Sequence, residues 1–181
     1  VAEKARTQIA PLTLTYPDMN MDDAYAVQRA WVDRKIADGD HITGYKIGLT
    51  SRAMQQAMNI TTPDFGILLS SMYFANHSQI NAADYTDPRI ETELAFVMKK
   101  PLQGDNVSID EVLDATDYVV PALELIAARS HRVDPATGYT RKVFDTISDN
   151  AANAGYIVGD TRSDPRDIDL RWSGAILYLN G

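Results

Sequence analysis

Residues 89–97 read RIETELAFV, and this stretch shows the alternation of a β-strand most clearly. Ile90, Leu94 and Phe96 share one face of the expected strand, and Glu91 and Glu93 share the other. The apolar content predicts a buried strand in the core of a sheet. Two neighbouring carboxylates on one face of such a strand therefore need a chemical explanation.

A shared cation is one explanation for these carboxylates. Side chains two residues apart on a strand point the same way, with Cα atoms roughly 6.5 Å apart. Glu124, in the apolar stretch 119–128, is a third acid in a similar setting. Burying an ionised carboxylate costs several kcal/mol, and three oxygen ligands suit Mg²⁺ or Mn²⁺. The alternative is that Glu91 and Glu93 face solvent while Glu124 pairs with Arg129.

Composition restricts the classes of protein that the chain can represent. The 181 residues fit one domain, and 17 basic against 25 acidic residues give a net charge of −8. This charge argues against a general nucleic-acid surface, which needs a basic field. There is no cysteine for disulfides or thiolate chemistry, and no apolar run approaches the length of a membrane span. We therefore expect a soluble, cytoplasmic protein without nucleic-acid or membrane partners.

The expected elements indicate an α+β fold around a mixed sheet. Asn20 can cap an amphipathic helix that Gly39 ends, and Ser108 opens another helix with a capping-box pattern. Further helices are expected after Ser51 and over 144–154, and strands over 41–49, 89–99, 119–128, 156–159 and 170–179. Residues 1–40 are expected to form an N-terminal helical segment, and 41–181 a catalytic mixed-sheet domain. The final Asn180-Gly181 favours a hairpin turn, which predicts that a further strand follows.

Lys46 lies in the stretch GYKIGLTS, residues 44–51, where a strand leads into a helix start. Its amine is a candidate for pairing with a carboxylate or for moving protons, although exposed lysines are the more common case. Free N–H groups after Leu49 and Thr50 are candidates for receiving a substrate carboxylate. Asp64 is a turn residue by default, and a base or a partner of other site residues in the functional interpretation.

The chain has one dense basic cluster: His131, Arg132, Arg141 and Lys142. A solvated loop is the ordinary interpretation of such a cluster. The functional alternative is that an arginine binds the second carboxylate of a dianionic substrate in a bidentate manner. Residues 148–150 read SDN, but the S-x-x-K and K-T-G motifs that accompany this triplet in β-lactamases are absent, which excludes that class.

Four blocks together resemble the hydratase/decarboxylase family of the fumarylacetoacetate hydrolase superfamily. They are GYKIGLTS at 44–51, PRIETELAFV at 88–97, DYVVPALELI at 117–126 and RKVFDTISDNAANAG at 141–155. The resemblance extends from about Tyr16 to the end of the chain. It implies a mixed β-sheet roll or barrel with flanking helices, and a homo-oligomer. Family members also continue past the final LYLNG, which implies that the C-terminal part of the sheet is incomplete here.

The resemblance also implies a site. The family binds Mg²⁺ or Mn²⁺ through an E-x-E pair and a later glutamate, which fall on Glu91, Glu93 and Glu124. Its active-site lysine and aspartate fall on Lys46 and Asp64. Substrate-binding positions then follow at Gly48, Leu49, Thr50, Arg132 and Arg141. One departure is Ala127, where family members often carry an acid.

The implied activity is a Mg²⁺-dependent hydratase of aromatic catabolism. The basic stretch at 131–142 resembles members that add water to a seven-carbon dioate, 2-oxohept-4-ene-1,7-dioate. Four alternatives stay open. They are hydration of the five-carbon 2-oxopent-4-enoate, decarboxylation of a 2-oxo-enedioate or C–C hydrolysis of an acylpyruvate at the same site, and a non-catalytic binding subunit.

Overall fold

The computed structural model describes residues 2–181 and divides them into two compact units. The first unit comprises residues 2–73, 79–89 and 125–155, and the second comprises 74–78, 90–124 and 156–181. These two units are defined by contacts between residues. They do not test the predicted division into an N-terminal helical segment, residues 1–40, and a catalytic domain, residues 41–181, which stays a prediction.

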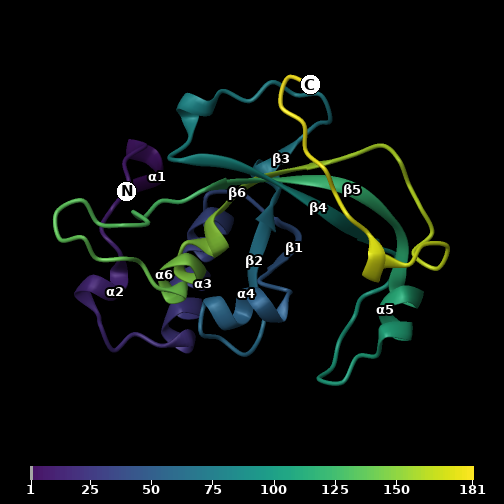
Figure 1. The fold of residues 1–181 in the computed structure, drawn as a ribbon, viewed down its shortest axis with the longest axis horizontal. Helices are drawn as coiled ribbons and strands as arrows, with labels where there is room; N and C mark the ends of the chain where they lie inside the picture. Colours follow the sequence, from purple (N-terminus) through teal and green to yellow (C-terminus); the bar gives the residue numbers. More distant parts are fainter. Residues whose placement is uncertain (1) are drawn as a thin grey trace. The chain divides into compact units, whose positions relative to one another are not determined.

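Helices and strands alternate irregularly along the chain, which confirms the α+β class (Figure 1). The α-helices are α1 (Ala2–Ala5), α2 (Leu12–Thr15), α3 (Met21–Ala37), α4 (Arg52–Ala57), α5 (Ile109–Ala115) and α6 (Val143–Ser148). The strands are β1 (Ile42–Gly48), β2 (Asp64–Leu69), β3 (Tyr73–Phe74), β4 (Pro88–Met98), β5 (Thr116–Ala127) and β6 (Asn153–Val158). Short 3₁₀ turns lie at Ser70–Met72, Ala82–Asp84, Asn150–Ala152 and Leu170–Trp172.

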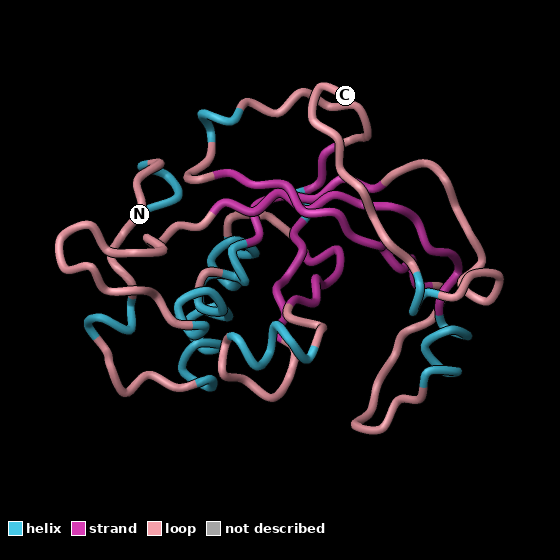
Figure 2. Tube along the Cα trace, viewed as in Figure 1, coloured by secondary structure: helices cyan, strands magenta, loops and turns pink. Residues whose placement is uncertain are grey.

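Two sheets are present, and Figure 2 shows their strands in magenta. β1 and β2 form an antiparallel pair within the first unit. The other sheet has the order β3-β6-β5-β4, so among residues 2–181 β4 has a neighbouring strand on one side only.

Helix α3 forms where its capping residues predict it. The Asn20 side chain accepts a hydrogen bond from the Asp23 N–H, and the Asp23 carboxylate accepts one from the Asn20 N–H. The buried positions Ala24, Gln28 and Val32 are four residues apart, and so form one stripe along the helix. Gln28 is the polar member of this stripe, and its carboxamide donates to the carbonyls of other elements, as described below.

Strand β4 exists as predicted, but the prediction that it is buried is wrong. The residues Ile90, Leu94, Phe96 and Met98 are each 40–42% exposed, and Glu91 and Glu93 are exposed as well. The order of the sheet gives the reason, because an edge strand has one neighbour rather than two. Alternation of side chains identifies a strand but does not say how much of each face is covered.

Two further expectations about elements are wrong. The helix expected over 144–154 ends at Ser148, and a left-handed turn at 150–152 leads into β6 instead. The strand expected over 170–179 is a short 3₁₀ turn followed by residues without regular structure. Strand propensity is realised only where a neighbouring strand is available to complete the hydrogen-bond ladder.

The first unit has an apolar core in which α3, β2 and α6 meet. Ala24, Val32, Leu69 and Ile147 are at most 4% exposed. The Gln28 carboxamide links the three elements, because Nε2 donates to the carbonyls of Phe65 (2.9 Å) and Ile147 (3.1 Å). Within residues 2–181, no helix combines the length and apolar character needed to cross a membrane.

Candidate active site

Three glutamates come together in the second unit. One carboxylate oxygen each from Glu91, Glu93 and Glu124 lies within 4.8 Å of the other two. The first two side chains leave the same face of β4, and the third comes from β5, the neighbouring strand. Strand pairing thus brings residue 124 next to residues 91 and 93, as the sequence hypothesis requires.

The chemistry of the cluster fits a hard divalent cation. Three carboxylates at this separation repel one another when ionised, and a cation placed among their oxygens reverses the sign of that interaction. Glu124 is only 4% exposed, whereas Glu91 and Glu93 are exposed. The argument from the cost of burial therefore applies to Glu124 alone. For Glu91 and Glu93, the argument for a bound cation rests on the short distances between their carboxylate oxygens and that of Glu124.

The alternative partner proposed for Glu124 is not available. Arg129 instead forms a buried ion pair with Asp149, with 2.5 Å between Nε and Oδ1. Its Nη1 and Nη2 atoms also donate to the carbonyl oxygen of Asn153. The pairing of Glu124 with Arg129 that was considered from the sequence is therefore wrong.

Lys46 and Asp64 lie on one face of the β1–β2 pair in the first unit. Lys46 pairs with Gly66 across the ladder, and Gly48 pairs with Asp64. Directly opposite residues in an antiparallel pair project from the same face. The lysine and the aspartate are therefore diagonal neighbours, and each faces a glycine.

The Asp64 carboxylate is buried beside the charge of Lys46. The residue is 4% exposed, and its Oδ1 atom is buried without a hydrogen-bond partner. Burial raises the pKa of Asp64, while the positive charge of Lys46 opposes the rise. A carboxyl group with a raised pKa holds or accepts a proton closer to neutral pH than an ordinary aspartate does, which suits acid–base chemistry.

β1 has an unusual distribution of exposed side chains. Tyr45 and Ile47 are 61% and 54% exposed, whereas Lys46 is half-buried. A strand that turns its lysine inward and its apolar residues outward does not follow the ordinary preference. This inversion supports a functional role for Lys46, and it was not visible from the type of residue alone.

The predicted substrate-binding positions lie at the end of β1 and in the turn that follows it. Leu49 has a left-handed backbone with φ 54°, and its carbonyl oxygen accepts a hydrogen bond from Gln55 Nε2 at 2.8 Å. Thr50 is exposed, and Ser51 caps α4 by accepting from the Met54 N–H. The capping residue is thus Ser51. The binding roles of Gly48, Leu49 and Thr50 stay predictions.

Arg132 and Arg141 are brought together by a backbone hydrogen bond from Arg141 N to Arg132 O of 3.0 Å. Arg132 is exposed. Arg141 is half-buried, and its Nη1 donates to Ser130 O at 3.3 Å. Burial lowers the pKa of Arg141, and the charge of Arg132 lowers it further. Both residues lie in the first unit, and their contact with a substrate stays a prediction.

Sequence reasoning missed Asn150, which fixes the position of β2. Its carboxamide accepts from the Ile67 N–H (2.7 Å) and donates to the Ile67 carbonyl (2.9 Å), so that it pairs as a strand residue would. Asn150 is fully buried. The signal that was available is a run of small and polar residues at 148–155, which was interpreted as a helix.

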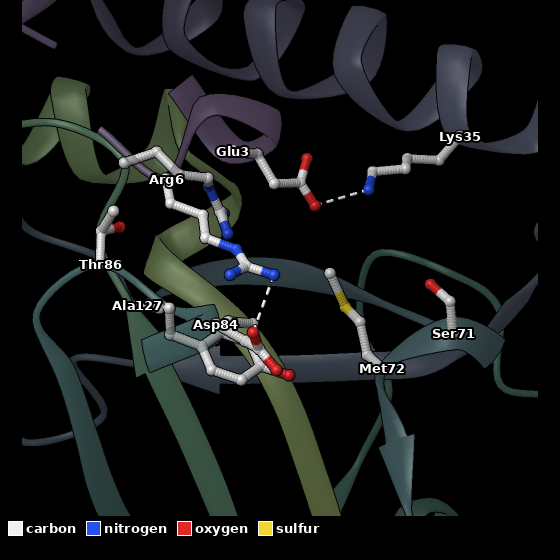
Figure 3. Close-up of a pocket in the computed structure, with 11 residues that line it drawn as sticks. Glu3, Arg6, Lys35, Ser71, Met72, Asp84, Thr86 and Ala127 are labelled. Carbon is white, nitrogen blue, oxygen red and sulfur yellow. Dashed lines mark hydrogen bonds and ion pairs between the residues drawn. The ribbon is translucent and has the colours of Figure 1, made fainter. Parts of the chain in front are cut away.

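A separate cavity of about 190 Å³ lies in the first unit, and none of the predicted site residues lines it (Figure 3). Two ion pairs cross its lining, Glu3 with Lys35 at 2.6 Å and Arg6 with Asp84 at 2.8 Å. Arg129, a third cation in the lining, is paired with Asp149. Because each described cation of the lining already has a partner, the cavity offers little attraction for an ionic ligand.

The described residues thus define an α+β protein with a carboxylate cluster suited to a divalent cation in the second unit and a lysine–aspartate pair in the first. A search of family models finds no match. The chain is 56% identical over 180 residues to the 2-oxo-hept-4-ene-1,7-dioate hydratase of Escherichia coli, covering 99% of this chain and 67% of that protein. It is 40% identical to a 2-keto-4-pentenoate hydratase of Paraburkholderia xenovorans, covering 96% of this chain and 62% of that protein.

A solved structure of a related enzyme has the same fold as this chain. The 4-oxalocrotonate decarboxylase from Pseudomonas putida G7, complexed with magnesium and adipate, superposes with a TM-score of 0.85 at 32% identity. The match covers 94% of this chain and 62% of that one. The chain therefore belongs to the hydratase/decarboxylase family of the fumarylacetoacetate hydrolase superfamily. It spans about two thirds of the length of the relatives that it matches.

Proposed function

We propose that the protein is a metal-dependent hydratase that converts 2-oxohept-4-ene-1,7-dioate into 4-hydroxy-2-oxoheptane-1,7-dioate. The convergence of Glu91, Glu93 and Glu124 within 4.8 Å carries this proposal. The 56% identity to a relative named for the seven-carbon dioate supports the choice of substrate.

The metal in this proposal is Mg²⁺, with Mn²⁺ as the alternative, held by the carboxylates of Glu91, Glu93 and Glu124. When bound, a divalent cation supplies Lewis-acid stabilisation of the negative charge that develops on the 2-oxo oxygen. One relative supports a divalent cation, because the 4-oxalocrotonate decarboxylase from Pseudomonas putida G7 has been solved once in complex with magnesium and once with calcium.

Proton transfer is assigned to Lys46 and Asp64. The reaction removes a proton from C3 and adds one at C5, which moves the double bond into conjugation with the ketone. Water then bonds to C4 while a proton returns to C3, so that the sum is the addition of one water. The Asp64 carboxyl, with its raised pKa, is suited to holding a proton between these steps, and the Lys46 Nζ amine is its exchange partner.

Binding of the remainder of the substrate is assigned to two groups of residues. Gly48, Leu49 and Thr50 are proposed to bind the 1-carboxylate end, and Arg132 or Arg141 the distal carboxylate. Exposed apolar side chains on β4 support the further proposal that the protein forms a homo-oligomer, which light scattering would test.

The test follows the absorbance of the conjugated enol form of the substrate, a 2-hydroxy-2,4-dienoate, with and without Mg²⁺, using five- and seven-carbon substrates. Glu93→Gln is expected to lower Mg²⁺-dependent turnover by at least about 100-fold, with the fold intact. Glu3→Gln, which removes a carboxylate from the separate cavity, is the control and should retain activity. Unchanged turnover in Glu93→Gln would refute the metal role.

A decarboxylase is the second candidate, because the structural similarity is to a 4-oxalocrotonate decarboxylase. Product analysis separates the two, since decarboxylation releases CO₂ and yields no hydroxy-dioate. C–C hydrolysis of an acylpyruvate would release pyruvate instead. Calorimetric binding of Mg²⁺ and a 2-oxo-dioate analogue without turnover would indicate a non-catalytic binding subunit.

A further inference from the structure

We propose that Gly48 and Gly66 are positioning residues, whose missing side chains provide the space in which Lys46 and Asp64 lie together. The catalytic consequence rests on the proposed function. The spatial claim rests on the β1–β2 pair alone.

The register of the two strands gives the first argument. Gly48 lies directly opposite Asp64, and Gly66 lies directly opposite Lys46. Each functional side chain therefore projects from the ladder beside a position with no side chain. Since opposite Cβ atoms in an antiparallel pair are only about 5 Å apart, a larger residue at either glycine would take up the space beside its partner.

The space at Gly48 is already filled by the functional groups. A Cβ built on this glycine would lie 2.3 Å from Asp64 Oδ1 and 3.0 Å from Lys46 Nζ. Both distances are shorter than ordinary van der Waals contacts. The carboxylate and the amine thus share the volume that any other residue at position 48 would occupy.

The space at Gly66 accommodates the stem of Lys46. A Cβ there would lie 3.1 Å from Cγ and 3.2 Å from Cδ of this lysine, and 2.8 Å from the backbone oxygen of Asn150. Asn150 cannot withdraw easily, because its carboxamide is bonded to both backbone groups of Ile67. Gly66 is therefore enclosed by a lysine stem and a fixed carbonyl.

Backbone conformation does not explain these glycines. Neither Gly48 nor Gly66 has a positive φ, in contrast to Gly39, Gly104 and Gly138. The requirement at positions 48 and 66 is thus one of space rather than of conformational freedom.

The surroundings of Asp64 make its placement sensitive to that space. Its Oδ1 atom is buried without a hydrogen-bond partner, and the backbone groups that hydrogen-bond to the carboxylate are those of Asp64 itself and of Gly48. The charge of Lys46 on β1 lowers the pKa of Asp64, and the Asp64 charge in turn raises the pKa of the Tyr25 phenol on α3. The geometry of the Lys46–Asp64 pair therefore depends on what occupies position 48.

Gly48→Ala is the decisive variant, because the atoms that its Cβ meets belong to the ends of side chains that can move. Gly44→Ala is a matched control on the same strand and face, where the nearest atom is Leu68 Cδ1 at an ordinary 3.6 Å. The carboxyl carbon of Asp64 is titrated by NMR in all three proteins. Turnover and KM are measured over the same range of pH.

We expect Gly48→Ala to move the Asp64 titration midpoint by about one pH unit and to lower kcat by about 10- to 100-fold. Gly44→Ala should have the same Asp64 titration midpoint and the same kcat as the native protein. An Asp64 titration and a kcat in Gly48→Ala that equal the native values would overturn the proposal. If the native protein hydrates no dioate, the proposed function fails, while the NMR comparison still tests the spatial claim.

A second pair of variants covers the case in which Gly48→Ala is poorly folded. In an Asp64→Ala background the carboxylate that the new Cβ would meet is gone. Gly48→Ala should then lower the melting temperature less than it does in the native background. Equal losses in the two backgrounds would show that the strand itself, and not the carboxylate, requires the glycine, and would contradict the proposal.

Discussion

Asp64 shows how one buried carboxyl group links stability to chemistry. Burial raises its pKa because the charged form loses its hydration, and the positive charge of Lys46 lowers the pKa by stabilising that charged form. Glycines at positions 48 and 66 leave room for this arrangement. The sequence predicts a turn at Asp64. The register of β1 and β2 instead places this residue in a strand, beside the one lysine of β1.

The raised pKa of Asp64 predicts a pH dependence of stability. The folded protein keeps the proton to a higher pH than the unfolded chain, whose aspartates titrate near pH 4. The unfolding free energy of the native protein should therefore fall as pH rises from about 4 to the raised pKa, and then level off.

Asp64→Asn isolates this contribution. Urea denaturation of both proteins across this pH range should show that the native protein loses stability relative to the variant as pH rises. Asp64→Asn should also lose most of its turnover, since an amide cannot exchange a proton. A constant difference in unfolding free energy would mean that Asp64 titrates normally.

At the scale of elements, the turn at Asn150–Ala152 is the feature that most departs from local preference. Its three residues have φ values of 54°, 52° and 59°, a left-handed conformation that costs roughly 1–2 kcal/mol per residue. Tertiary contacts offset this cost. Asp149 accepts hydrogen bonds from the backbone and side chain of Arg129, and Asn150 pairs with Ile67.

Asn150→Ala is expected to lower the unfolding free energy by about 2–4 kcal/mol, because two buried backbone groups of Ile67 lose their partner. Asn150→Gly tolerates the left-handed φ and loses the same hydrogen bonds, so it should be destabilised less but still clearly. Urea unfolding measures both. A glycine variant as stable as the native protein would show that the carboxamide contributes little.

Local signals predicted the start of some elements better than their extent. Asn20, Ser51 and Ser108 each accept the hydrogen bond expected of a helix cap, because capping depends on residues within one turn. The end of α6 could not be predicted in this way. It depends on a turn that is held by Arg129 and Ile67, which lie far away in the sequence.

Each of the two units contains one group of the residues to which the proposed function assigns roles. The carboxylate cluster belongs to the second unit, and Lys46 and Asp64 belong to the first. The cluster is the part that a metal titration tests without any substrate.

Mg²⁺ at about 100 times its dissociation constant should stabilise the folded protein by about 2.7 kcal/mol, or about 5 to 10 °C in Tm. The reason is that an ion that binds the three assembled carboxylates has no comparable site in the unfolded chain. Calorimetric melts with Mg²⁺ and with EDTA measure the shift. Glu93→Gln should abolish most of it and Glu3→Gln should not. Identical melts of the native protein would contradict a metal site.

Alternation and capping act over a few residues, so local patterns are enough to predict the α+β class, the strand that bears Glu91 and Glu93, and the helices marked by their caps. The folded protein was needed to show that Glu124 lies beside this pair, that β4 lies at an edge of its sheet, and that Lys46 and Asp64 face glycines across a ladder. These features depend on strand order and register. Contacts between residues distant in the chain set that order and register, and no local pattern encodes them.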